Sequence, residues 1–269
     1  MYMPKVILIT GASSGIGRAC AEYLAEKGFV VYGTSRKAMM GRNGIRMLQM
    51  DVTSLESVKL AVDTIISEKG RIDVAINNAG MGVAGAAELT TINEIQWQIQ
   101  TNFIGTVNVC NAVLPHMRKA GCGRIINISS LGGVMGIPFQ SIYSASKFAV
   151  EGYSEALSLE VYPFNVKVII VEPGDFSTEF TNNRIMSAAT KNDPDYGARF
   201  QNCLSIIERE EVGGCHPSKI AKQMYRIVKS KRPRFRYKVG NLIQTNFARA
   251  KKIMPDRMYL RLLRFFYHV

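Results

Sequence analysis

The sequence predicts a single-domain α/β protein in which helices cover both faces of a doubly wound parallel sheet, a three-layer α/β/α arrangement. Short apolar runs alternate with helical segments from residue 5 to about residue 172, which is the order of parallel β-α-β units. The apolar runs are continuous rather than alternating, as in strands that are buried on both faces. The 269 residues, 47% of them hydrophobic, are enough for one sizeable core.

Each expected strand is a short run rich in Val and Ile and bounded by residues that favour turns. Strands are expected at residues 5–10, 29–34, 46–50, 72–77, 124–129, 166–172 and 234–239. Helical spacing is found at residues 16–27, 54–69, 94–119, 141–162, 217–229 and 256–267. Ser54 is the expected N-cap of its helix, with Glu56 and Ser57 in the first turn.

The pattern weakens between residues 175 and 215. A connection of this length is unusual within a compact domain, so we expect a functional lid with short helices. Residues 1–240, including this lid, are therefore expected to form the main domain, and residues 241–269 a basic helical extension.

The charge of the chain is concentrated near its end. The formal net charge is +13, and residues 216–269 contain 15 of the 34 Lys and Arg residues but only one acid, Asp256. Such a local excess predicts one basic surface rather than a generally basic protein.

Cysteine and histidine usage argues against a disulfide framework and against a zinc enzyme. The five cysteines are scattered and lack CxxC spacing, which is typical of reduced thiols in a cytoplasmic protein. None of the three histidines has a neighbour at metal-ligand spacing, so we expect no zinc mechanism. The first strand begins at about Lys5, so no signal peptide is expected, and no stretch is apolar enough for a transmembrane helix.

A glycine-rich turn lies between the first strand and the first helix. Glycines let the backbone approach a pyrophosphate, and the helix N-terminus offers free N–H groups and the positive end of its dipole. The alternative is a turn that binds nothing, but the strand–turn–helix context favours a dinucleotide site in a Rossmann-type fold. The residues expected there are Gly11, Ser13, Ser14, Gly15, Ile16 and Gly17.

The end of the second strand indicates which dinucleotide binds. An acid there would bind the ribose 2′-hydroxyl of NAD, but this strand ends without one and is followed by Arg36 and Lys37. Arg36 can form a bidentate pair with a 2′-phosphate. The sequence thus predicts NADP(H); the alternative is that both cations are merely solvated and that NAD(H) binds.

Tyr143 and Lys147 are four residues apart and therefore share one face of a helix. A nearby ammonium lowers the pKa of a phenol from about 10, which suits proton transfer to a carbonyl oxygen. Ser130, at the end of a strand, can donate to that oxygen. Asn102 either holds a water that links Lys147 to solvent or simply satisfies backbone groups.

The same spacing occurs in Tyr225 and Lys229, which we interpret as an accidental pair on an outer helix. No Ser stands thirteen residues before Tyr225, where the chain has Val212, and the pair does not follow a Ser-Ser strand end. A half-buried structural tyrosine is the corresponding alternative for Tyr143.

The TGxxxGxG turn, the segment Asn77-Asn-Ala-Gly80 and the order Asn102, Ser130, Tyr143, Lys147 resemble the short-chain dehydrogenase/reductase family over about residues 4–180. Details of the run from Ser129 to Tyr143 resemble its hydroxysteroid and retinol dehydrogenase-like branch. The resemblance implies that these four residues are a catalytic tetrad. It also implies further cofactor contacts at Asp51, Val52, Asn78, Ala79, Gly80, Pro173, Gly174 and Thr178.

The resemblance implies an NADP(H)-dependent oxidoreductase that interconverts an alcohol and a ketone or aldehyde, built as a homodimer or homotetramer on two long helices. A hydrophobic substrate such as a steroid, retinoid or long-chain keto-lipid would suit the apolar residues near the site. These residues, which core packing explains equally well, are the segment 131–139 with Phe176, Phe180, Ile185, Met186 and Phe200.

The terminal helix is expected to be amphipathic and basic. Its basic face contains Arg257, Arg261, Arg264 and His268, and its apolar face Tyr259, Leu262, Leu263 and Phe266. Such a helix can contact an anionic membrane surface, cover the active site or contact a neighbouring subunit. Nucleic-acid binding is not expected, because no recognition helix or aromatic-bearing strand is evident.

Two other kinds of function stay open beside the enzyme. One is an NADP-binding sensor without turnover, for which an intact tetrad would have no use. The other is a peripheral membrane-surface protein that acts through its basic tail. In either case we expect a cytoplasmic protein, with membrane association at the surface as the open question.

Overall fold

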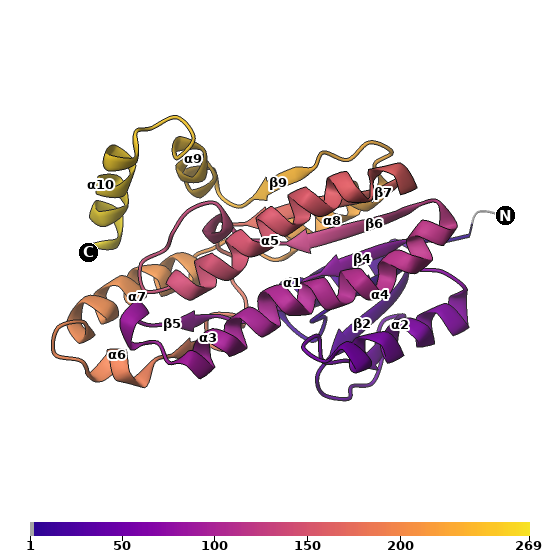
Figure 1. Cartoon of the computed structure of the whole chain (residues 1–269), viewed down its shortest axis with the longest axis horizontal. Coiled ribbons are helices and arrows are strands. Elements are labelled where there is room, and N and C mark those ends of the chain that lie inside the picture. The colour runs from indigo at the N-terminus through magenta and orange to yellow at the C-terminus, as the bar shows by residue number, and fades with distance from the viewer. Residues whose placement is uncertain (1–2) are drawn as a thin grey trace.

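The sheet of the protein grows outward from β1 (Val6–Ile9), in the computed structural model that describes residues 3–269 (Figure 1). Seven parallel strands lie in the order β3-β2-β1-β4-β6-β7-β9. The other six are β2 (Val30–Ser35), β3 (Ile45–Gln49), β4 (Val74–Asn77), β6 (Gly123–Ile128), β7 (Val166–Pro173) and β9 (Arg236–Val239). This confirms the doubly wound parallel sheet, and all seven expected strands are found.

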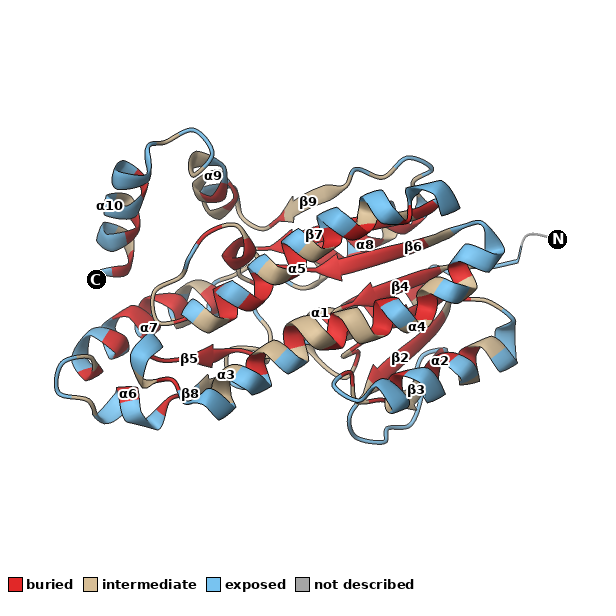
Figure 2. Ribbon diagram, in the orientation of Figure 1, coloured by how far each residue is buried: buried red, intermediate tan, exposed pale blue. Residues whose placement is uncertain are grey.

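Alternate side chains of β1 enter different cores, which explains why its apolar run is continuous. Ile7 and Ile9 pack with α1 (Gly15–Glu26) and α8 (Ser218–Lys229) on one face. Leu8 packs with the helices of the other face, α2 (Leu55–Lys69), α4 (Gly105–Ala120) and α5 (Ser141–Glu160). Burial of each such side chain stabilises the fold by about 1.5–3 kcal/mol. Figure 2 shows the buried strands between helices whose outer faces are exposed.

Ser54 caps α2 as expected, its hydroxyl accepting a hydrogen bond from the Ser57 N–H at 3.2 Å. The single helix expected at residues 94–119 is wrong in detail. The structure has α3 (Ile92–Ile99), a π-helical turn (Gln100–Ile104) and then α4. The start is earlier because Thr91 and Glu94 form a reciprocal capping box. π turns inside helices are frequent at functional sites, and this one contains Asn102.

The weakly patterned region is more regular than expected. After β8 (Ile185–Met186), which pairs in parallel with β5 (Val83–Ala84), come α6 (Ala188–Asn192) and α7 (Gly197–Val212). α7 has 16 residues, so the expectation of only short helices is wrong. The helix is held because Phe200, Cys203 and Ile207 recur at helical spacing and are buried.

The C-terminal extension contains two helices, of which the sequence predicted only the second. The first, α9 (Leu242–Ala250), begins at Asn241, whose side chain caps the Gln244 N–H. α10 (Asp256–Tyr267) packs Tyr259, Leu263 and Tyr267 against a cluster that includes Leu131 and residues of α7. Its apolar face is thus turned toward the end of the sheet.

The remaining elements are short. Three 3₁₀ turns lie at Ala87–Leu89, Leu131–Gly133 and Tyr162–Phe164. No helix within residues 3–269 combines the length and the apolarity that a membrane span requires.

Candidate active site

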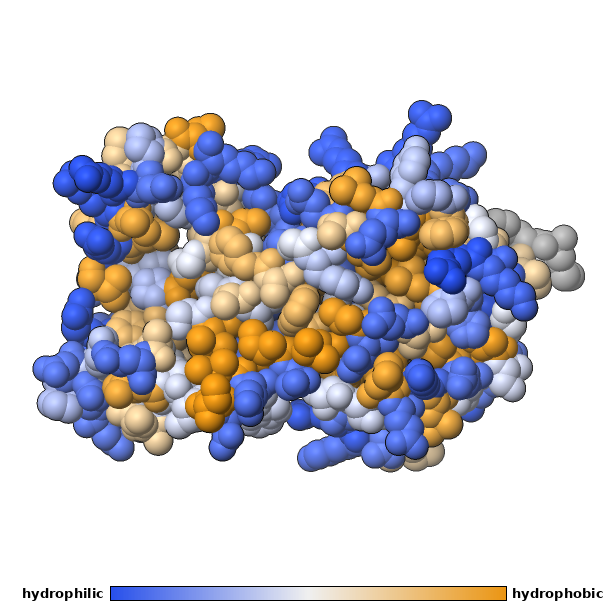
Figure 3. Space-filling model, viewed as in Figure 1, coloured by the Kyte–Doolittle hydropathy of each residue, from blue (hydrophilic) through white to orange (hydrophobic). Residues whose placement is uncertain are grey.

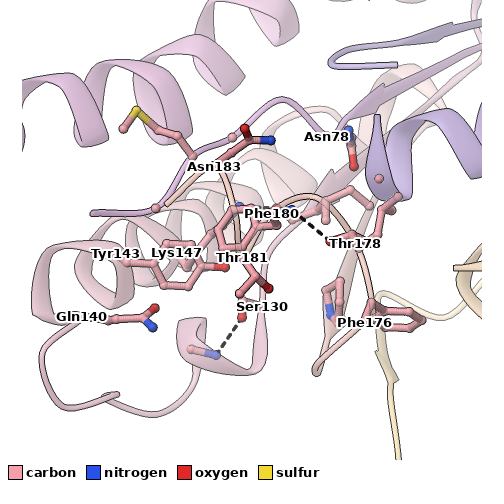
Figure 4. A pocket seen from close by; sticks show the side chains of 18 of the residues that line it. Asn78, Ser130, Gln140, Tyr143, Lys147, Phe176, Thr178, Phe180, Thr181 and Asn183 are labelled. Carbon is pink, nitrogen blue, oxygen red and sulfur yellow. Dashed lines mark hydrogen bonds between the residues drawn. The ribbon is translucent and has the colours of Figure 1, made fainter. Parts of the chain in front are cut away.

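One large cleft of about 1380 Å³ opens at the carboxyl ends of the central strands. Ligands of open parallel sheets bind at this edge, where the strand order reverses on either side of β1. The cleft is lined by the glycine turn, the ends of β4, β6 and β7, the lid and both C-terminal helices. Figure 4 shows part of this lining, with Tyr143, Ser130 and Phe180 close together.

The glycine turn is fixed to the end of β4 by Thr10 and Asn78. The Thr10 hydroxyl accepts hydrogen bonds from the N–H groups of Asn78 and Ala79, each at 2.9 Å. The Asn78 side-chain amide donates to the carbonyls of Thr10 and Gly11 at 2.9 and 3.1 Å. A Cβ at Gly17 would overlap the Gly11 carbonyl, so only glycine permits this approach.

The expected nucleotide residues converge on the cleft, apart from Gly17, which packs beneath the turn. The lining residues among them are Gly11, Ser13, Ser14, Gly15, Ile16, Arg36, Lys37, Asp51, Val52, Asn78, Ala79, Gly80, Pro173, Gly174 and Thr178. Thr10 is the first residue of the TGxxxGxG turn, but the sequence did not predict that its hydroxyl anchors the turn to β4.

The glycine turn already binds an anionic group. The Gly15 N–H, at the N-terminus of α1, donates to the Glu179 carboxylate at 3.0 Å, and Arg18 lies 3.6 Å from the same carboxylate. A helix N-terminus favours negative charge through its free N–H groups and its dipole. The residues present therefore fit a pyrophosphate at this turn, with Glu179 as its competitor.

Tyr143 lies in the part of the cleft that is lined by residues 175–185 and by the C-terminal helices, called here the chamber, where its ring is 5.9 Å from that of Phe180. Burial raises the pKa of its phenol to about 12, and hydrogen bonding to Ser130 opposes this only in part. The direction is opposite to the expected one. The cause is the burial of the phenol. The Lys147 ammonium donates instead to the Ile128 carbonyl at 2.9 Å, and its nitrogen lies 5.9 Å from the centre of the Tyr143 ring.

Lys147 is buried beneath the cleft floor. Burial lowers the pKa of its ammonium to about 8, and the Glu151 carboxylate, one turn along α5, works in the opposite direction. A Cβ at Gly80 would lie 3.7 Å from the Lys147 nitrogen and 3.3 Å from the Asn102 side-chain oxygen. Lys147 and Asn102 thus meet beside the loop that follows β4.

Ser130 caps the 3₁₀ turn that follows β6, and its hydroxyl oxygen accepts from the Gly132 N–H at 3.0 Å (Figure 4). That bond uses an oxygen lone pair, so the O–H hydrogen stays available to donate. Ser130 is therefore placed to donate to a substrate oxygen beside Tyr143.

Asn102 is buried behind the cleft wall. Its amide nitrogen donates to the Met81 carbonyl and to the Ser146 hydroxyl, both at 3.0 Å, and its side-chain oxygen accepts from the Met81 N–H at 2.9 Å. One N–H group and the oxygen thus anchor the loop after β4, and the other N–H group ties Asn102 to α5. A role in holding a water stays a prediction.

Most of the apolar residues singled out in the sequence divide between the cleft and the core, but Met186 is exposed in β8 and belongs to neither. Leu131, Met135, Ile137, Phe176, Phe180 and Ile185 line the cleft. Phe139 and Phe200 instead pack together in the core, with ring centres 5.4 Å apart. Tyr225 packs edge-on against Tyr23 at 5.9 Å and is not part of the cleft, which fits its interpretation as an accidental pair.

Sequence reasoning left covering of the active site by the terminal helix as one of three alternatives, and it missed α9 and three acids. The cleft is also lined by Asp175, Glu210, Glu211, Ile243, Gln244, Phe247, Leu263, Phe266 and Tyr267. The amphipathic pattern of α10 was a signal for part of this set, but it did not say what the apolar face covers. Within residues 3–269, no group of three or more His, Cys, Asp or Glu side chains is arranged to hold a metal ion.

Structures of the same fold contain either nicotinamide nucleotide. ElxO, solved with NADP bound, is 27% identical, with a TM-score of 0.72 over 88% of this chain and 97% of that one. A short-chain dehydrogenase/reductase from Burkholderia phymatum, solved with NAD, is 22% identical, with a TM-score of 0.75 over 88% and 90% of the two chains. The fold alone thus does not select between the two nucleotides.

Comparison with known proteins identifies the family. The short chain dehydrogenase family model matches residues 5–188. The chain is 58% identical to a 3-ketodihydrosphingosine reductase of Bacteroides thetaiotaomicron over 99% of both chains, and 34% identical to retinol dehydrogenase 8 of Bos taurus over 87% of this chain and 80% of that one. A short-chain dehydrogenase from Streptomyces avermitilis has a TM-score of 0.84 at 33% identity, covering 94% of this chain and 93% of that one. The chain therefore belongs to the short-chain dehydrogenase family and is an oxidoreductase acting on CH–OH or keto groups.

Proposed function

We propose that the protein is an NADP(H)-dependent oxidoreductase that interconverts the ketone and the secondary alcohol of a long-chain amino-lipid of the 3-ketodihydrosphingosine type. The observation that carries the proposal is the placement of Ser130 and Tyr143 inside an apolar-walled chamber. The 58% identity to a 3-ketodihydrosphingosine reductase across both whole chains supports the choice of substrate.

The nicotinamide, when bound, supplies the hydride. Ser130 donates a hydrogen bond to the substrate oxygen as negative charge develops there. Tyr143 gives that oxygen a proton, and burial, which raises the pKa of its phenol to about 12, keeps the proton on the phenol until it is needed. Lys147 would hold the ribose of the bound nucleotide, and it supplies positive charge near the phenol, with its nitrogen 5.9 Å from the centre of the Tyr143 ring.

Arg36 and Lys37 support a preference for NADP(H). Both line the cleft where β2 ends, and no carboxylate stands at that strand end to bind a ribose 2′-hydroxyl or repel a 2′-phosphate. A planar guanidinium pairs with phosphate through two parallel hydrogen bonds, so Arg36 is the main determinant.

Retinoids are the second candidate substrate class, favoured by the 34% identity to retinol dehydrogenase 8. The full chain would be supplied with NADPH and, separately, 3-ketodihydrosphingosine, a long-chain ketone without the amine, retinal and a 3-ketosteroid. Loss of NADPH absorbance should be fastest with 3-ketodihydrosphingosine. Faster turnover of retinal or the steroid would contradict the proposed substrate.

A homo-oligomer built on α4 and α5 is part of the proposal. Figure 3 shows apolar surface on the face of the molecule over these helices. Phe148 and Leu159 on α5 are 41% and 75% exposed, and together with this apolar surface they support a subunit contact there. Light scattering of the purified chain should give a dimer or tetramer mass.

The C-terminal extension is proposed to serve the substrate chamber and to contact membrane surfaces. Its apolar face covers the cleft, while Phe265, 82% exposed, lies beside the exposed Arg261 and Arg264. An exposed aromatic beside cations suits the interface of an anionic bilayer. We place the protein in the cytoplasm, in keeping with its free cysteines. Cosedimentation with anionic but not neutral vesicles tests the contact.

A further inference from the structure

The cleft carries opposite charges at its two ends. At the nucleotide end the charged residues that line it, within the described residues, are Arg36, Lys37 and Asp51, and Lys147 lies below Tyr143. The carboxylates of Asp175, Glu210 and Glu211 line the substrate chamber, and apart from Lys147 below Tyr143 no Lys or Arg lines it within the described residues. The positive charge of the chain is concentrated in residues 216–269, so this acidic chamber contrasts with the basic C-terminal segment.

Glu211 already has its partners and is not available to a ligand. Its carboxylate pairs with the guanidinium of Arg184, which is buried, and accepts a hydrogen bond from the Thr181 hydroxyl at 2.7 Å. A buried carboxylate with both a cation and a hydroxyl is satisfied. Glu211 therefore serves to hold the lid segment that contains Thr181 and Arg184.

Asp175 is in a different position. It follows the Pro173-Gly174 turn, and one carboxylate oxygen accepts from the Gln244 amide at 2.6 Å. No Lys or Arg among residues 3–269 lies within ion-pair distance of Asp175, and no described group donates to its second oxygen. Burial and the nearby Glu211 and Glu210 raise the pKa of this carboxyl to about 7. A cation bound in the chamber would stabilise the ionised carboxylate of Asp175 against both its burial and the repulsion from the two glutamates.

Asp175 lies close to the reacting groups along the chain fold. A Cβ at the preceding residue, Gly174, would lie 3.3 Å from the side chain of Leu131, which directly follows Ser130. Asp175 lines the same cleft as Tyr143 and as Tyr267 of α10, and its carboxylate is held by Gln244 of α9. Asp175 is therefore placed on the C-terminal side of the chamber, where substrate atoms next to the reacting carbonyl would be.

We propose that Asp175, assisted by Glu210, binds the ammonium group of a substrate whose amine is on the carbon next to the reacting ketone. The inference rests on the proposed function and deepens it, because 3-ketodihydrosphingosine has an amine at that position. With the ketone oxygen at Ser130 and Tyr143, the ammonium reaches the acidic side of the chamber. Retinoids and steroids lack this group and would leave the carboxylate without a partner.

The test compares two substrates of equal chain length, one with the 2-amino group and one without it. In the full chain with NADPH, Asp175→Asn should lower kcat/KM for the amino ketone by roughly ten- to a hundredfold, the worth of a hydrogen bond to a charged group. The loss should be mainly in KM, and the ketone without the amine should be unchanged or faster. An N-acetylated amino ketone, which has no positive charge, should lose the preference in the wild type.

Glu208→Gln is the matched control, because Glu208 is on α7 like Glu210 but does not line the cleft. It should leave the preference for the amine unchanged, whereas Glu210→Gln should lower it less than Asp175→Asn does. If Asp175→Asn fails to fold, as judged by circular dichroism, Glu210→Gln decides. Equal losses on both ketones, or no loss on either, would overturn the inference.

A binding measurement separates the inference from the proposed function. Calorimetry of the wild type with NADP should give tighter binding for a long-chain 2-amino-alcohol than for the same alcohol without the amine, and Asp175→Asn should remove the difference. Should the wild type reduce neither ketone, the proposed function fails. The inference then fails as well if the wild type binds both alcohols equally.

Discussion

The two halves of the cleft are built in different ways. The nucleotide half is made of short segments that directly follow strands, such as the glycine turn after β1 and the loop after β4, and their backbones are joined by Thr10 and Asn78. The substrate half is assembled from the lid and from α9 and α10, which are distant in the sequence. The nucleotide half is therefore formed by residues that directly follow strands, whereas the substrate half forms only when elements distant in the sequence pack together.

The largest expected effect separates catalysis from cofactor binding. Tyr143→Phe should lower kcat by about 10²- to 10⁴-fold, the usual worth of a positioned acid or base, because it removes the proton that the substrate oxygen receives. NADPH affinity, measured by fluorescence titration, should change little. Tyr225→Phe, at the second pair with this spacing, is the matched control and should keep full activity. Comparable losses in both variants would contradict the role of Tyr143 as the proton donor to the substrate oxygen.

The nucleotide half can be tested alone through its cations. Arg36→Ala should weaken NADPH binding by roughly ten- to a hundredfold, since a charge-assisted hydrogen bond to the 2′-phosphate is lost, and should leave NADH binding nearly unchanged. Arg42→Ala is the control, because Arg42 is exposed and pairs with Glu22 instead of lining the cleft. Equal weakening of NADPH and NADH would contradict the phosphate contact.

The substrate half can be tested through α10. Leu263 is 6% exposed and lines the cleft, so Leu263→Ala should cost about 2 kcal/mol or more of stability and raise KM for a long-chain substrate. NADPH affinity should not change. Leu260→Ala, on the same helix but 50% exposed, should stay within about 0.5 kcal/mol of the wild type. An increase in KM for NADPH would show that the two halves are not separate.

The acidity of Asp175 predicts a smaller, pH-dependent effect. Its pKa in the folded chain, about 7, is above that of an unfolded Asp, about 4, so ionisation of the buried group destabilises the fold. The cost is absent below about pH 4, grows as pH rises toward 7 and is constant above it. Asp175→Asn should therefore become more stable than the wild type across this window, although Glu210, Glu211 and Arg184 also act on the group.

Chemical unfolding at pH 4 and pH 8 measures that difference. The control is Asp63→Asn, whose carboxylate is exposed on α2, and its effect should not vary between the two pH values. The same constancy in Asp175→Asn would contradict the unpaired, buried carboxylate on which the substrate contact depends.

The positions of site residues could be predicted from the sequence where these residues belong to one helix or directly follow one strand. Tyr143 and Lys147 share a helix face by spacing alone, and Gly11 and Gly15 follow a strand directly, so their positions in the cleft were expected. The sequence was not sufficient for the pKa of Tyr143, because the spacing does not show that Lys147 donates to the Ile128 carbonyl. Burial, a property of the whole fold, then decides the direction.

The substrate half was predicted only in part, for a related reason. The apolar face of α10 was evident, but the residues that it packs against were not. They are α7 and the segment around Leu131, and Leu131 lies more than a hundred residues before α10 in the chain. Asp175 was not singled out because a lone acid in a loop resembles a solvated residue. Only the fold shows that Gln244 and two glutamates surround it.

The most direct test of the account follows the hydride itself. The full chain would reduce 3-ketodihydrosphingosine with NADPH that carries deuterium at C4 of the nicotinamide, using each of the two C4 stereoisomers in turn, and the product would be analysed by mass spectrometry. We expect one deuterium on the carbon that bore the ketone, from one of the two stereoisomers only. A product without deuterium from either, or no product while NADPH still binds, would contradict it.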